Sequence, residues 1–76
     1  MTLNEIVTQL NEGDELRNAV AALVNHETNL VELSREGYFI TVQWWDNNLV
    51  EIAKWVNTDT KRGYSLSDWG FQVISV

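Results

Sequence analysis

The fold is decided by residues 38–56, which read YFITVQWWDNNLVEIAKWV. Apolar side chains recur at every second position on both sides of Asp46-Asn47-Asn48, and this spacing is typical of two strands joined by a turn. A turn of three residues, 46–48, sets Trp44 opposite Val50. In that register Lys54 is the only charged residue on a face that otherwise contains Tyr38, Ile40, Val42, Trp44, Val50, Ile52 and Val56.

A turn of two residues is the alternative, and the hydrophobic pattern disfavours it. It would shift the pairing by one residue, and a shift of one exchanges the two faces because side chains alternate along a strand. Glu51 would then join the apolar face, while Val50 would leave it. The pattern therefore predicts the three-residue turn. The outer pairs expected from it are Phe39 with Trp55 and Trp45 with Leu49.

The adjacent indoles Trp44 and Trp45 show what this alternation means for the surface. Neighbouring side chains on a strand point to opposite sides of the sheet, so we expect Trp44 in the core with Tyr38, and Trp45 outside. Large aromatic side chains exposed on a small domain are typical of surfaces that a partner covers. The middle of the outer face is expected to be polar, with Thr41, Gln43 and Glu51. The residues that we expect to contact a partner are Phe39, Trp45, Leu49 and Trp55.

Two helices are predicted before the strands. Thr2 and Glu5 have the spacing of a capping box, and apolar residues then recur at helical intervals. On one continuous helix the second apolar stripe would lie about a third of a turn from the first, so a straight helix could not bury both. We therefore predict a break, with Gly13 ending the first helix and Asp14 as the N-cap of the second. The predicted helices cover about residues 2–12 and 14–26.

After the helices, the period of the apolar residues changes to two. A Glu36-Gly37 turn would pair Leu33 with Ile40 on the core face. Residues 57–69 form a polar connection, long for a hairpin, which contains either a short structured turn or a functional loop. The predicted strands cover about residues 29–34, 38–45, 49–56 and 70–76. The sequence thus predicts a single α+β domain of two layers, with two N-terminal helices packed on one face of a mainly antiparallel four-stranded sheet.

Composition and charge narrow the class of protein. The chain has 76 residues, a net charge of −6 and no cysteine. It has no basic amino-terminal region and no apolar run long enough to span a bilayer, so we expect a cytoplasmic protein with no membrane contact. The acidity lies mostly in the first third of the chain, where it would attract a basic partner. The residues expected to steer such a partner are Glu5, Glu12, Asp14 and Glu15.

Residues that could carry catalysis or hold a metal are sparse. His26 is the only histidine and lies near the predicted end of the second helix, as surface or capping residues do. The serines lack the context of a nucleophile elbow, and the four glycines form no phosphate-binding loop. Asp46-Asn47-Asn48 followed by Glu51 lacks the central glycine and the distant glutamate of a calcium loop. We therefore expect no enzyme activity, no metal and no cofactor.

The charges disfavour two functions that involve nucleic acid. Aromatic side chains on a sheet can stack single-stranded bases, but such surfaces also carry a positive groove, and this chain has 5 basic against 11 acidic residues. The reverse hypothesis is a DNA mimic with acidic helices, but these acids form no long array with phosphate spacing. Both are lesser alternatives.

The pattern favours a small acidic protein-binding module without enzyme activity. As a stoichiometric inhibitor or adaptor, it would occupy the surface of a partner protein through the aromatic outer face, with the acidic helices orienting the encounter. The alternative is a structural homo-oligomer, at its simplest a homodimer. In it, the same aromatics or the carboxy-terminal edge strand, Phe71–Val76, would pair with a second copy.

Overall fold

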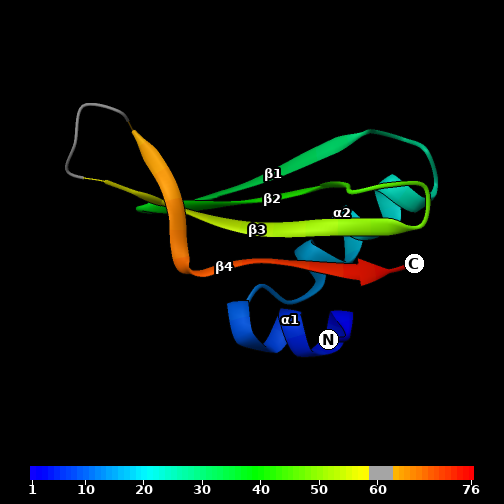
Figure 1. The fold of residues 1–76 in the computed structure, drawn as a ribbon, viewed down its shortest axis with the longest axis horizontal. Helices are drawn as coiled ribbons and strands as arrows, with labels where there is room; N and C mark the ends of the chain where they lie inside the picture. The colour runs from blue at the N-terminus through cyan, green and yellow to red at the C-terminus, as the bar shows by residue number, and fades with distance from the viewer. Residues whose placement is uncertain (59–62) are drawn as a thin grey trace.

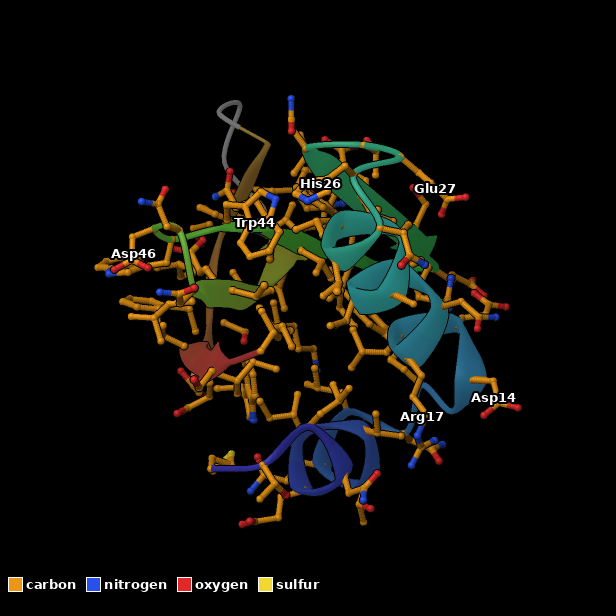
Figure 2. All side chains as sticks on the ribbon, turned by 90° about the vertical axis from the view of Figure 1, so that its right-hand side faces the viewer. Asp14, Arg17, His26, Glu27, Trp44 and Asp46 are labelled. Carbon is orange, nitrogen blue, oxygen red and sulfur yellow. The ribbon has the colours of Figure 1, made fainter. Side chains whose placement is uncertain are left out.

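A computed structural model of the chain describes residues 1–58 and 63–76. The strands form one antiparallel sheet in the order β1-β2-β3-β4, and both helices lie on the same side of it (Figures 1 and 2). The predicted α+β fold, with two helices packed on a four-stranded sheet, is confirmed. In chain order the elements are α1 (Leu3–Leu10), α2 (Asp14–Val24), β1 (Leu30–Arg35), β2 (Tyr38–Trp44), β3 (Leu49–Asn57) and β4 (Tyr64–Ser75).

The pairing of β2 with β3 has the predicted register. Trp44 lies opposite Val50, and just beyond the strand end the Trp45 N–H donates to the Leu49 carbonyl over 2.7 Å. The two faces divide accordingly, since Val50 is fully buried and Trp45 is 54% exposed. Trp44 is half-buried at the border of the core, on the helix side of the sheet and near His26 (Figure 2). The prediction that Trp44 faces inward and Trp45 outward is confirmed.

The first hairpin also pairs as predicted, with Leu33 opposite Ile40. Its turn is Glu36-Gly37, and Gly37 has φ 84°, a backbone conformation that favours glycine. The core lies between the sheet and the helices because the strands and the helices each turn one apolar side toward it. Its buried members are Ile6, Val7, Leu10, Leu16, Ala19, Val20, Leu23, Ile40, Val42, Val50, Ile52 and Ile74.

The break between the helices is present, but its caps differ from the prediction. Thr2 and Glu5 form the predicted capping box, whereas α1 ends before Gly13 because Asn11 adopts the left-handed conformation at φ 55°. Asp14 as N-cap is wrong. Gly13 is the N-cap of α2, with φ 63° and ψ −143°, a conformation that residues with a side chain rarely adopt. Asp14 lies instead in the first turn, 3.6 Å from Arg17, where its negative charge still favours the helix dipole.

The largest departure from the prediction is β4. It begins at Tyr64, so Tyr64–Trp69 belongs to a strand and not to a polar connection. Leu66 pairs with Trp55, and Phe71 pairs with Ala53. Residues 67–70 of β4 therefore lie opposite a single residue of β3, Lys54. This bulge bends the strand sharply, as the turn from orange to red in Figure 1 makes visible. Residues 59–62 of the predicted connection lie outside the described residues.

The bulge in β4 brings Trp69 to the helix side of the sheet. Its indole packs against the core, and Nε1–H donates to Oε1 of Gln9 in α1 over 2.9 Å. Gly70 follows with φ 72°, which lets the strand return to its pairing with β3. The bend therefore ties β4 to α1 at one end of the core.

The two adjacent indoles should differ in their effect on stability. Trp44→Ala is expected to lower the free energy of unfolding by about 2–3 kcal/mol, because it removes a large ring from the border of the core. Trp45→Ala is expected to cost about 1 kcal/mol, since the exposed ring contributes chiefly through its stacking on Phe71. Urea unfolding followed by circular dichroism measures both. A cost at Trp45 equal to or larger than that at Trp44 would contradict the assignment of faces.

Candidate functional site

The candidate site is the outer face, meaning the surface of the sheet that is turned away from the helices. Eight large hydrophobic side chains are exposed among the described residues. By strand alternation and register, five of the eight belong to the outer face. Those five are Leu30, Trp45, Tyr64, Leu66 and Phe71.

One end of the outer face carries a three-ring cluster of Phe39, Trp55 and Tyr64. Phe39 and Trp55 lie opposite each other on β2 and β3, as predicted, and stack with centroids 6.1 Å apart and planes 12° from parallel. Tyr64 meets Phe39 edge-on, with centroids 4.9 Å apart at 77°. Such aromatic pairs add about 0.5–1.5 kcal/mol each beyond the area they bury, so the three rings hold one another in place.

The three-ring cluster also reaches the middle of the outer face through Trp55. The Trp55 Nε1–H donates to the Thr41 hydroxyl over 2.9 Å, and Thr41 is only 8% exposed. Ala53, also on the outer face, is 1% exposed. The expected polar middle is therefore only partly present at the surface. It consists of Gln43 and Glu51, which lie opposite each other and form a hydrogen bond of 3.0 Å between Nε2–H and Oε1.

The other group of rings on the outer face is a two-ring pair of Trp45 and Phe71. The rings stack with centroids 5.8 Å apart and planes 20° from parallel. Stacking leaves them largely in contact with water, since Trp45 is 54% and Phe71 43% exposed. This pair joins the end of β2 to the carboxy-terminal half of β4, across β3. It is an ordered apolar surface that the chain itself does not cover.

The residues expected to contact a partner all lie on the outer face, but their exposure differs. Trp45 is exposed, whereas Phe39, Leu49 and Trp55 are half-buried. Their role in contact with a partner stays a prediction. The sequence reasoning missed three exposed residues of the same face, Tyr64, Leu66 and Phe71. The alternation of apolar residues with serine in Tyr64-Ser65-Leu66-Ser67 is the signal of a strand that would have indicated the first two.

The four acidic residues expected to steer a partner do not form one exposed cluster. Glu5 accepts hydrogen bonds from Thr2 in the capping box, and Asp14 lies fully open beside Arg17 at the start of α2 (Figure 2). Glu15 is exposed but accepts a hydrogen bond from Arg35. Glu12 does not fit the expectation, because its side chain is only 2% exposed and is paired with Arg35.

Glu12 is instead the centre of a structural link between the helices and the first hairpin. Its Oε1 lies 2.7 Å from Arg35 Nη2, an ion pair in which the N–H direction does not meet hydrogen-bond geometry. Its Oε2 accepts a hydrogen bond of 3.3 Å from the Tyr38 hydroxyl. The hydrogen bond to Glu15 raises the pKa of Arg35, and the charge of Glu12 adds to this rise while burial opposes it. Burial raises the pKa of Tyr38, with a further contribution from the Glu12 carboxylate.

Open hollows lie elsewhere on the described part of the molecule. One of about 460 Å³ lies beside the bulge, between Lys54 and Trp69. A smaller one of about 350 Å³ lies between His26 and the β2–β3 turn. Within residues 1–58 and 63–76, no three acidic or histidine side chains come together as metal ligands do. No helix in the same part of the chain is long and apolar enough to cross a membrane.

Arg35 should be more important for stability than an exposed arginine. Arg35→Met leaves the buried Glu12 carboxylate without its countercharge, and we expect a larger loss in the free energy of unfolding than at an arginine whose partner is exposed. Arg17→Met is the matched control, since Arg17 pairs with an exposed carboxylate and should cost less than about 1 kcal/mol. Urea unfolding of both variants tests this, and similar losses would contradict a structural role for Glu12. A second change, Glu12→Gln, should recover part of the loss in Arg35→Met.

The raised pKa of Tyr38 has a consequence at high pH. Folding favours the neutral phenol, so this contribution to stability is complete below about pH 10 and is lost as pH rises through the higher pKa of the folded chain. As pH rises above about 10, the Tyr38→Phe variant should therefore lose less unfolding free energy than the parent. Urea titrations at a series of pH values measure the difference, with Tyr64→Phe as the control for loss of a hydroxyl. Identical pH profiles for Tyr38→Phe and the parent would contradict the expectation.

Comparison with family models, with curated proteins and with solved structures finds no significant match to this chain.

Proposed function

We propose that the chain is a protein-binding module without enzyme activity, which occupies a partner's surface with its outer face as an inhibitor or adaptor does. One observation carries the proposal: the exposed large hydrophobic side chains gather on this face, although the chain has a core of its own on the other. Exposed apolar patches on small proteins are typical of interaction surfaces. Tyrosine and tryptophan are also among the residues that contribute most to binding energy at such surfaces.

The order of the rings supports the same function. Trp45 stacks on Phe71, and Tyr64 packs edge-on against Phe39. Side chains that are already held in one geometry lose little conformational entropy when a partner covers them. The outer face therefore presents preorganised anchors at two places, the two-ring pair and the three-ring cluster.

The charges favour a basic partner. Among the described residues, the outer face carries Glu32 and Glu51 and no basic side chain. The chain as a whole has a net charge of −6, and Asp14 and Glu15 expose their carboxylates on α2. Such a field accelerates the approach of a basic protein more than it increases final affinity. The acidic helices would thus affect the rate of association with the partner, and the rings would determine the affinity.

Trp45→Ala is the direct test of this proposal. We expect it to weaken binding to a partner, identified by co-purification with the tagged parent chain, by at least about tenfold, because central aromatic anchors contribute about 2 kcal/mol or more. Val24→Ala is the matched control, since Val24 is also exposed and apolar but lies at the end of α2. Isothermal titration calorimetry with the purified partner measures both. Equal affinities for the two variants would overturn the assignment of the outer face.

A measurement of mass distinguishes this function from self-association. If the outer face bound a second copy, sedimentation equilibrium would give a mass that rises with concentration up to tens of micromolar, and Trp45→Ala would abolish the rise. A monomer throughout this range would exclude the homo-oligomer and leave the unlike partner.

A further inference from the structure

The two edges of the sheet differ in how they are protected against pairing with another strand. β1 has 6 residues and carries charged side chains at Glu32 and Arg35. β4 has 12 residues, and Asp68 is its only charged side chain. Short strands and charged side chains are the means by which natural sheets avoid pairing at an edge. The carboxy-terminal half of β4 is therefore the less protected edge.

The pairing of β4 with β3 determines which backbone N–H and C=O groups of β4 point toward the open edge. The Val76 N–H donates to the Asn48 carbonyl over 3.1 Å, so the even-numbered residues of this half of β4 face β3. Alternation then turns the N–H and C=O groups of Phe71, Val73 and Ser75 toward the open side. Outside the sheet ladder, no hydrogen bond between described residues reaches the backbone of these three residues. The chain thus presents a regular row of donors and acceptors that matches an extended strand.

The open edge of β4 could pair with a second copy of this chain or with an extended segment of another protein, and the position of α1 distinguishes between the two. α1 lies alongside β4, set back to the side of the sheet where α2 also lies (Figures 1 and 2). A second copy would bring its own α1 to the same place, and its charge of −6 would oppose an equal charge. An extended segment of another protein has no second layer, so it meets neither obstacle.

We propose that the Phe71–Ser75 edge of β4 accepts an extended segment of a partner protein as a fifth strand. Where it pairs, the segment is uncharged and apolar on one side, because its neighbours across the edge on the outer face are Phe71 and Val73. On either side of the paired residues it is basic, because the chain that receives it is acidic. The bulge at residues 67–70 ends the regular edge, so the paired part spans about five residues, or roughly 17 Å. This inference rests on the open backbone groups of the edge, and Phe71, which also belongs to the two-ring pair, bears only on the side chains of the segment.

Backbone amide exchange with a synthetic probe peptide tests the proposal. The probe reads KKTVYVTKK, which is apolar at its centre and basic at both ends. In the free monomer, the amides of Phe71, Val73 and Ser75 should exchange much faster than those of Gln72 and Ile74. Saturating probe should slow exchange at the first three by at least about tenfold, because each amide gains a hydrogen bond. Slow exchange at these three amides in the free monomer, or protection by the probe only elsewhere, would overturn the proposal.

Total chemical synthesis of the chain supplies the matched variants. An N-methyl group at Val73 removes one open donor without changing a side chain or a ladder hydrogen bond. The control is an N-methyl group at Glu32, whose N–H faces the open edge of β1 by the same alternation. The first should weaken probe binding by at least about tenfold and the second by less than about twofold. Equal effects would overturn the proposal.

The two proposals can fail separately. Trp45→Ala should leave the protection of the three β4 amides by the probe unchanged, since the rings make no hydrogen bond to a fifth strand. If Trp45→Ala abolished this protection, the probe would be bound by the outer face, and strand addition would be excluded.

Discussion

The register between β2 and β3 is the constraint on which the rest of the structure depends. It aligns Val42 with Ile52 and brings both, together with Ile40 and Val50, to full burial on the helix side. A shift of one residue would turn Glu51 toward the helices and send Val50 and Ile52 to the outer face, so the helices would cover a charged side chain in place of two apolar ones. The same pairing fixes which residues remain outside. The core and the candidate site are therefore two consequences of one alignment.

This alignment could be predicted because it is local. The two strands are joined by three residues, and one charged side chain, Glu51, is enough to separate the correct register from its neighbour. The course of β4 could not be predicted in the same way. Its alternation is interrupted at residues 67–70, and the bend there depends on Trp69 reaching Gln9, which lies sixty positions earlier in the chain. A local pattern does not contain such a contact, so the bend and the place of Phe71 on the outer face were not predicted, whereas the alternation over residues 64–67 was visible in the sequence.

The rings of the outer face do not all need a partner to explain them. In the three-ring cluster, Trp55 donates a hydrogen bond to the nearly buried Thr41, so this cluster already stabilises the sheet from its far side. The two-ring pair is different, because Trp45 remains 54% and Phe71 43% exposed after they stack. Two rings that remain this exposed contribute little to the free energy of unfolding. Of the two groups of rings, the two-ring pair is therefore the one whose place on the surface stability explains least.

The distribution of charge separates both proposed contact surfaces from the rest of the molecule. The described basic residues are all engaged near the helices or the core: Arg17 and Arg35 pair with carboxylates, and the Lys54 ammonium lies 4.7 Å from the centre of the Tyr38 ring. The outer face and the end of β4 hold few charges, so covering them requires little desolvation of ions. The net charge of −6 acts over a longer range, about 8–10 Å at moderate salt, and repels a second copy before any contact forms. Together these features support our proposal of an unlike, basic partner over a second copy of the chain.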